Sequence, residues 1–93
     1  MRFEWDPKKS RGNEKKHGLS FSEAKTLFES GVDYLEIYDE DHSADEDRFI
    51  AIGPAEGGFI VVAWTERPNG SIRIISARWA TRREQRLYQE YLR

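Results

Sequence analysis

Arginine residues give the second half of the chain its most distinctive chemistry. Arg67 follows one apolar run, Arg73 and Arg78 lie within the next, and Arg82 comes just beyond it. A guanidinium group binds two phosphate oxygens at once through its planar fork. A single arginine is as often a solvated or ion-paired surface charge. Arginines gathered from two predicted strands and the start of a helix nevertheless indicate a phosphate-bearing ligand.

The segment from Lys8 to His17 has no apolar side chain, although its pattern is helical. Its polar residues share one face at helical spacing: Lys9, Asn13, Lys16 and His17. A surface helix normally buries an apolar stripe, so this helix is either a solvated connector or a polar stripe along a binding cleft. A histidine side chain can take up and release a proton, which suits His17 for proton transfer. The alternative is that His17 only forms a hydrogen bond with a carbonyl group at the helix end.

Acidic side chains crowd residues 39–47, and their spacing invites comparison with a calcium-binding loop. Alternate residues from Asp39 to Asp45 match the ligand positions of an EF-hand. However, Ala44 stands where glycine is required, and Ile50 stands where a bidentate glutamate is required. An EF-hand is therefore excluded. A solvated acidic loop, a looser cation site and a docking surface for a basic partner remain open.

The composition excludes several other kinds of site. The chain has no cysteine, which excludes disulfides, thiolate catalysis and cysteine zinc sites and fits a reducing cytoplasm. It has no P-loop, no dinucleotide-binding glycine pattern and no HExxH motif, so we expect no cofactor and no metal. No apolar run approaches the roughly 18 residues of a membrane helix. The N-terminal residues lack the apolar region of a signal peptide.

The charge is distributed unevenly along the 93 residues, although the net charge is only −2. Residues 1–28 carry seven basic and four acidic side chains, and residues 48–93 carry eight basic and four acidic ones. Residues 29–47 carry nine acidic side chains and no basic one. Local charge decides which partner a surface attracts. We therefore expect the basic segments to face an anionic substrate and the acidic stretch to lie away from the cleft.

Local patterns predict three helices. Asp6 and Pro7 are a helix start, and Gly18 is a helix stop. A second helix begins with the capping box at Ser20 and ends at Gly31, and a third begins with the capping box at Thr81. Along the third helix, four apolar side chains share one side: Leu87, Tyr88, Tyr91 and Leu92.

Alternation of apolar and polar residues predicts a short strand at residues 2–5 and four more at residues 34–38, 48–52, 59–65 and 71–79. Short turns between the last three favour an antiparallel meander. By the period of two, Arg73 and Arg78 are expected on opposite faces of their strand. The predicted fold is a single α+β domain over residues 1–93. Two N-terminal helices and a C-terminal helix pack on an antiparallel sheet of four to five strands.

Several segments, in order along nearly the whole chain, resemble the BrnT toxins of bacterial type II toxin–antitoxin systems. The matching pieces are Phe3-Glu4-Trp5-Asp6-Pro7, Asn13, Lys16-His17-Gly18, Phe21, Glu23-Ala24, Asp47-Arg48, Ile52-Gly53, Thr65-Glu66-Arg67, the stretch from Ile72 to Thr81, Glu84, Arg86 and Tyr88. The combination of Lys16-His17-Gly18 with Ile75-Ser76-Ala77-Arg78 is the most distinctive part. Trp79 departs from many members of the family.

The resemblance implies a RelE/ParE-like fold and a cytoplasmic ribonuclease that halts growth by cutting RNA. It implies a cognate BrnA-like antitoxin of the ribbon-helix-helix type, with operator DNA bound only through that antitoxin, and a toxin–antitoxin heterotetramer. Metal-independent RNA cleavage needs cations on the scissile phosphate and groups that transfer protons. The residues that fit catalysis are Arg67, Arg78, His17 and Glu66. Those that fit substrate binding are Lys16, Arg73, Arg48 and Arg82.

Two alternatives belong to other functional classes. One is a non-catalytic binding module that docks a partner or an RNA. The other is a toxin of the related fold that acts on a protein target. Induced expression followed by analysis of RNA ends distinguishes the three hypotheses.

Overall fold

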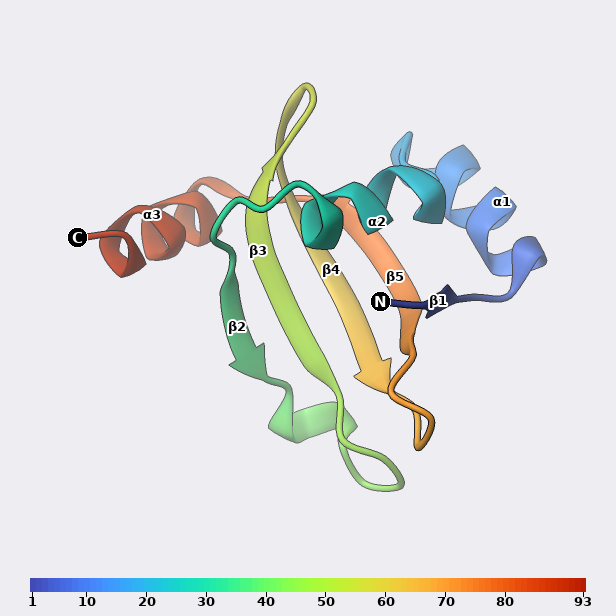
Figure 1. The fold of residues 1–93 in the computed structure, drawn as a ribbon. Coiled ribbons are helices and arrows are strands. Elements are labelled where there is room, and N and C mark those ends of the chain that lie inside the picture. The colour runs from blue at the N-terminus through green and yellow to red at the C-terminus, as the bar shows by residue number, and fades with distance from the viewer.

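A computed structural model describes all residues 1–93, in which a five-stranded sheet carries three helices (Figure 1). The elements follow the chain as β1 (Phe3–Glu4), α1 (Pro7–His17), α2 (Phe21–Glu29), β2 (Leu35–Tyr38), a short 3₁₀ helix (Glu40–His42), β3 (Phe49–Ala55), β4 (Gly58–Glu66), β5 (Ile72–Trp79) and α3 (Arg82–Tyr91). The predicted α+β architecture is confirmed.

The sheet has the strand order β1-β5-β4-β3-β2. Strands β2 to β5 form the predicted antiparallel meander, whereas β1 pairs with β5 in parallel and brings Glu4 beside Arg73. In Figure 1 α1, α2 and α3 lie beside the upper part of the sheet, and the lower ends of β2 to β5 project beyond them. The strand termini and loops at this lower end are therefore not covered by an α-helix, and the short 3₁₀ helix lies beside them.

Local capping residues fix the helix ends as the sequence predicts. The Asp6 side chain accepts a hydrogen bond from the Lys8 backbone N–H, Pro7 opens α1, and Gly18 ends it in the left-handed conformation at φ 73°. In α3, Thr81 and Glu84 form a complete capping box. Each motif satisfies backbone groups that would otherwise lack partners at a helix end.

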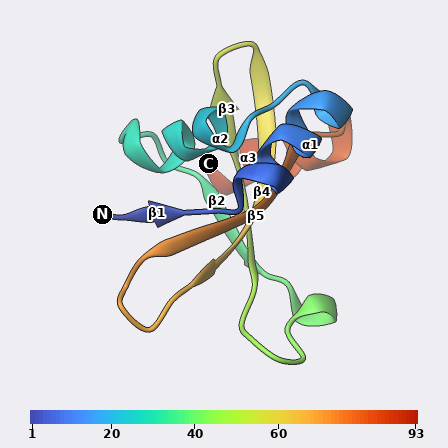
Figure 2. The same ribbon diagram turned by 90° about the vertical axis from the view of Figure 1, so that its right-hand side faces the viewer.

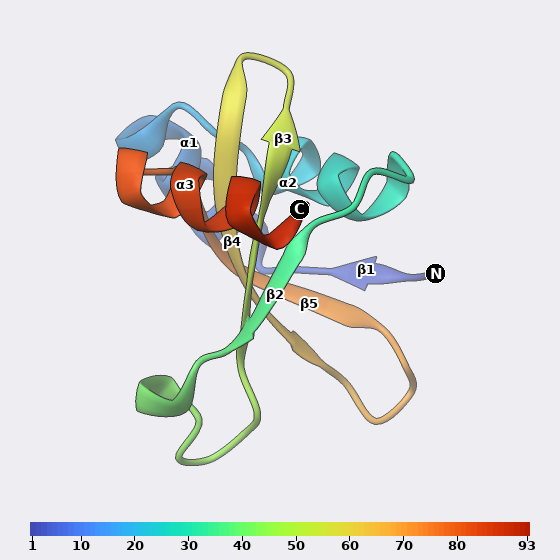
Figure 3. The same cartoon turned by 90° about the vertical axis from the view of Figure 1, so that its left-hand side faces the viewer.

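The two faces of the sheet have separate cores. On one face, Phe21, Ala24 and Leu27 of α2 pack into an apolar cluster with side chains of β3, β4 and β5. On the other face, where α3 lies (Figure 3), the Tyr88 side chain packs with Ile52 and Val61. Adjacent strand residues point to opposite faces, so α2 and α3 sandwich the sheet. Only Tyr88 of the predicted apolar side of α3 is buried, while Leu87, Tyr91 and Leu92 remain exposed.

A bulge in β5 overturns the prediction that Arg73 and Arg78 lie on opposite faces. Thr65 pairs with Arg73 and Val61 pairs with Arg78, and the register shifts between them. Thr65 and Val61 are four residues apart on β4, so their side chains point to the same face. The extra residue in β5, Ile75, shifts the alternation of side chains between the two faces by one residue. Arg73 and Arg78 therefore lie on the same face, which is the face that carries α3.

Candidate active site

Three arginines meet at the lower end of the sheet and form what we call the arginine cluster: Arg48, Arg67 and Arg73. Arg48 precedes β3, Arg67 follows β4, and Arg73 lies near the start of β5. In an antiparallel meander these three positions fall at the same end of the sheet. Their side chains are between 36% and 44% exposed, so all three can reach a ligand.

Two glutamates link the arginine cluster into a chain of ion pairs. Glu4 Oε1 lies 3.2 Å from Arg67 Nε and 3.9 Å from Arg73 Nη1. Glu46 Oε2 lies 3.8 Å from Arg67 Nη1, and its Oε1 lies 3.4 Å from Arg48 Nη2. Exposed pairs of this kind are individually weak. Together they hold three positive charges near one another, and the five groups keep a net positive charge.

The expectation that the acidic stretch lies away from the site was wrong. Glu46 belongs to that stretch and binds two of the three arginines. The next residue, Asp47, lines a pocket of about 430 Å³ together with Phe49, Glu66, Arg67 and Pro68. The physical reason is the topology, because the acidic loop leads directly into β3 at the end of the sheet where the arginines gather.

Glu66 lies in this pocket beside Arg67, which fits its predicted role in proton transfer. It is exposed at the end of β4 and shares the pocket with Asp47, whose carboxylate accepts a hydrogen bond of 2.9 Å from the Tyr38 hydroxyl. No hydrogen bond or ion pair engages the Glu66 side chain. Its carboxylate is therefore free to accept a proton next to a guanidinium group.

Arg78 lies at the opposite end of β5 and has a different set of contacts. Its Nη1 and Nη2 each donate to a carboxylate oxygen of Glu84 at 2.8 Å. The hydrogen bond from Arg78 lowers the pKa of Glu84 from 4.5 to about 2, despite the opposing effect of burial. The hydrogen bond to Glu84 likewise raises the pKa of Arg78. This pair joins β5 to the first turn of α3. The Arg78 guanidinium is therefore held by a bidentate partner, whereas the guanidinium groups of the arginine cluster are not.

Helix α1 lies along β5 (Figure 2). One polar side chain of α1, that of Asn13, attaches the helix to the strand. Asn13 Nδ2 donates to the Ala77 carbonyl at 2.7 Å and to the Leu19 carbonyl at 2.9 Å, while Asn13 Oδ1 accepts from the Ala77 N–H at 3.2 Å. His17 is half-buried and Lys16 is exposed, and neither forms a hydrogen bond or ion pair with the arginines. Arg82, the first residue of α3, is exposed and also unpaired.

Comparison with known proteins identifies the relatives of this fold and site. The family model described as the ribonuclease toxin BrnT of type II toxin–antitoxin systems matches residues 5–84. The chain belongs to this family. Among solved structures, the crystal structure of the Brucella abortus ribonuclease toxin BrnT matches with a TM-score of 0.65 and 29% identity, over 88% of this chain and 99% of that chain. No curated protein sequence matches.

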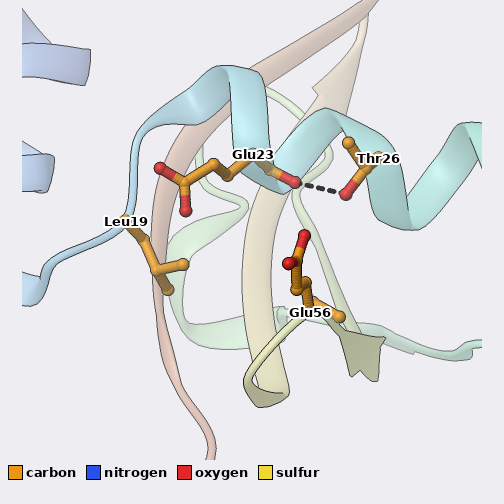
Figure 4. A pocket seen from close by; sticks show the side chains of 5 residues that line it. Leu19, Glu23, Thr26 and Glu56 are labelled. Atoms are coloured by element: carbon orange, nitrogen blue, oxygen red, sulfur yellow. Dashed lines mark hydrogen bonds between the residues drawn. The ribbon is translucent and has the colours of Figure 1, made fainter.

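Three further kinds of feature bear on function in this BrnT-family fold: metal-ligating clusters, membrane helices and other pockets. No group of three or more His, Asp or Glu side chains converges to hold a metal ion, and no helix is long and apolar enough to cross a membrane. A second pocket, of about 210 Å³, lies between α2 and the turn joining β3 to β4 (Figure 4). Its charged residues are Glu23 and Glu56, which repel phosphate.

The pairing of Glu4 and Glu46 with the arginine cluster was not predicted from the sequence. A signal for Glu4 was present, because Phe3 and Trp5 alternate with it and therefore place it on the opposite side of the strand. For Glu46 there was none, since one carboxylate among nine in the acidic stretch looks like any other. The structure brings Arg48, Arg67 and Arg73 together, and it places Glu66 in a pocket with Arg67 alone of these three. The residues that lie apart from them are Arg78, Arg82, Lys16 and His17.

Proposed function

We propose that this BrnT-family chain is a metal-independent endoribonuclease that cleaves RNA and thereby inhibits translation and growth. The observation that carries the proposal is the arginine cluster, in which three partly exposed guanidinium groups gather at one end of the sheet. One of them, Arg67, shares a pocket with the unpaired carboxylate of Glu66. Guanidinium groups that are held in fixed positions can stabilise the negative charge of a dianionic phosphate transition state.

The cleavage proceeds by attack of the RNA 2′-oxygen on the adjacent phosphorus. The new P–O bond forms as the bond to the 5′-oxygen breaks, which leaves a 2′,3′-cyclic phosphate and a 5′-hydroxyl. Glu66 takes the proton from the 2′-hydroxyl, and Arg67 and Arg73 stabilise the charge on the non-bridging oxygens. Arg48 binds a neighbouring phosphate. The leaving 5′-oxygen takes a proton from solvent water, because His17, the predicted donor, lies at the end of α1 apart from the arginine cluster.

The remaining proposed residues lie along the path of a longer RNA strand. Arg78 shares its sheet face with Arg73 because of the bulge at Ile75. Its guanidinium is bound to Glu84, so an RNA phosphate would share that pair. Lys16 and Arg82 are exposed cations on helices α1 and α3, and each would contact the RNA backbone away from the scissile bond.

We further propose that the toxin acts in the cytoplasm and is neutralised by a cognate BrnA-like antitoxin. Membership of a type II toxin–antitoxin family supports a protein antitoxin as the partner. The antitoxin is of the ribbon-helix-helix type and binds operator DNA, and two toxins assemble with two antitoxins.

Induced expression in bacteria tests the catalytic proposal. The wild-type chain should arrest growth and generate new RNA 5′ ends, whereas Arg67→Ala should lower cleavage at least about a hundredfold because the phosphate loses its central fork. The matched control is Arg93→Ala, which removes an unpaired arginine at the end of the chain. Purified toxin should also cleave in excess chelator.

Other outcomes point to the alternatives. Growth arrest without new RNA ends would indicate a protein target, and unaffected growth would indicate a binding module. Full toxicity of a folded Arg67→Ala variant would show that the site lies elsewhere.

A further inference from the structure

In the segment Phe3–Asp6, three residues contribute to folding and the fourth, Glu4, does not. The rings of Phe3 and Phe28 lie 5.7 Å apart, and those of Trp5 and Phe21 lie 6.5 Å apart. Asp6 caps α1. Glu4 contributes nothing to these contacts, because its side chain points to the other face and reaches Arg67 and Arg73.

We propose that Glu4 is a positioning residue for RNA cleavage, which holds Arg67 and Arg73 side by side as one phosphate-binding surface. The inference rests on the proposed function and extends it to a residue that does not touch RNA. A single oxygen, Oε1, faces nitrogens of both guanidinium groups. Two like charges repel and two long side chains lose entropy when they are fixed. A carboxylate between them offsets both effects before the RNA arrives.

The geometry leaves Arg67 free to bind phosphate while Glu4 holds it. Glu4 takes the Nε position at 3.2 Å, which leaves the two terminal nitrogens of Arg67 for a ligand. The position of Glu4 is itself fixed, because β1 pairs in register with β5 and the Ile72 N–H donates to the Arg2 carbonyl at 2.9 Å. The main chain thus sets the distance between the carboxylate and Arg73.

Glu46 differs from Glu4 both in how its backbone is held and in which nitrogen of Arg67 it approaches. It lies in a loop, and it approaches a terminal nitrogen of Arg67 at 3.8 Å, where a phosphate oxygen would bind. Glu46 is therefore the carboxylate that RNA displaces, and Glu4 is the one that remains. This contrast provides a matched control within the same chain of ion pairs.

Steady-state cleavage by purified Glu4→Gln and Glu46→Gln variants tests the proposal, in whichever system the wild type cleaves, free RNA or translating ribosomes. We expect Glu4→Gln to lower kcat about tenfold, the effect of losing one charge-assisted contact in the transition state. Its KM should not rise, because the variant has one negative charge fewer and attracts RNA at least as well. Glu46→Gln should lower KM and leave kcat within about twofold.

A second readout separates positioning from folding and from the proposed function. The NMR chemical shift of Arg67 Nε should reflect the carboxylate 3.2 Å away in the wild type, and should move in Glu4→Gln but not in Glu46→Gln. A Glu4→Gln variant with wild-type kcat, or with an unchanged Arg67 signal, would overturn the positioning role. A wild-type chain that cleaves no RNA would instead overturn the proposed function, and the NMR signal would still decide whether Glu4 holds Arg67.

Discussion

Arg73 and Arg78 lie on the same face of β5 but differ in how many of their guanidinium nitrogens remain free to bind a ligand. Arg78 places both terminal nitrogens on Glu84 at 2.8 Å, whereas Arg73 meets Glu4 with a single nitrogen at 3.9 Å. A bidentate pair fixes a guanidinium group in place, and a single long contact does not. Arg73 is therefore suited to bind a ligand, and Arg78 is suited to join the sheet to α3.

The stability contributed by the Arg78–Glu84 pair should depend on pH with a definite sign. The folded-state pKa of Glu84 is about 2, below its ordinary value of 4.5. The contribution is therefore fully present above pH 4.5 and is lost as the pH falls toward 2. Because Arg78 is partly exposed, we expect Glu84→Gln to cost about 1 to 2 kcal/mol at pH 7. This difference should vanish near pH 2 in chemical denaturation experiments.

Glutamine keeps the capping interaction with Thr81, so the Glu84→Gln variant isolates the charge. Glu90→Gln, on the same helix but without an ion pair, is the control and should leave stability within about 0.5 kcal/mol at every pH. A difference that grew on acidification would contradict the assignment.

Helix α1 shows how an element without apolar side chains can still be held in place. Its inward residues are Ser10, Asn13 and His17. Ser10 Oγ accepts a hydrogen bond from the Phe21 N–H at 3.0 Å, and Asn13 makes three hydrogen bonds to the main chain. The polar stripe predicted from the sequence was thus partly structural, because Asn13 docks α1 on β5 while Lys9 and Lys16 face the solvent.

Asn13→Ala should lower the free energy of unfolding by about 2 to 3 kcal/mol, because three main-chain groups lose a partner. Chemical denaturation followed by circular dichroism measures this change. Asn13→Asp should be no more stable than Asn13→Ala, since a carboxylate cannot donate to the Leu19 and Ala77 carbonyls. Lys16→Ala, on the exposed side of α1, should change stability by less than about 0.5 kcal/mol. Equal stability of the Asn13→Ala and Lys16→Ala variants would show that α1 is held by other contacts.

The sequence predicted the helix ends and the antiparallel meander because both depend on neighbouring residues. Each capping motif acts on backbone groups within four residues of itself, and these motifs are Asp6-Pro7, Gly18, and Thr81 with Glu84. The bulge at Ile75 could not be predicted, since Ile74 and Ile75 are both apolar and either can point inward. The pairing of Glu4 with Arg67 joins residues far apart in the chain, and only the parallel pairing of β1 with β5 brings them together.

Over the whole molecule, several exposed apolar side chains lie away from the arginine cluster, although Ile37 and Tyr38 lie near it at the end of β2. The arginine cluster occupies the lower end of the sheet, while exposed Leu87, Tyr91 and Leu92 lie on α3 and Trp79 lies just before it. A small domain with several exposed large apolar side chains commonly binds another protein. This arrangement is consistent with a toxin whose antitoxin covers apolar surface.

Co-expression with the proposed antitoxin should therefore yield a stable complex of two toxins and two antitoxins. Size-exclusion chromatography with light scattering measures its mass, and growth arrest should be relieved in the same cells. A mass of one toxin with one antitoxin would contradict the heterotetramer, and growth arrest that persists despite complex formation would contradict neutralisation.

The three hydrogen bonds of Asn13 have a consequence for the solubility of the chain. Strand β1 covers only the first two residues of β5, so the N–H and carbonyl groups of Ala77 face outward along an uncovered border. Open strand borders recruit strands from other molecules and lead to aggregation. One amide side chain occupies these groups as a neighbouring strand would. An asparagine in α1 thus blocks the addition of a foreign strand along this part of β5.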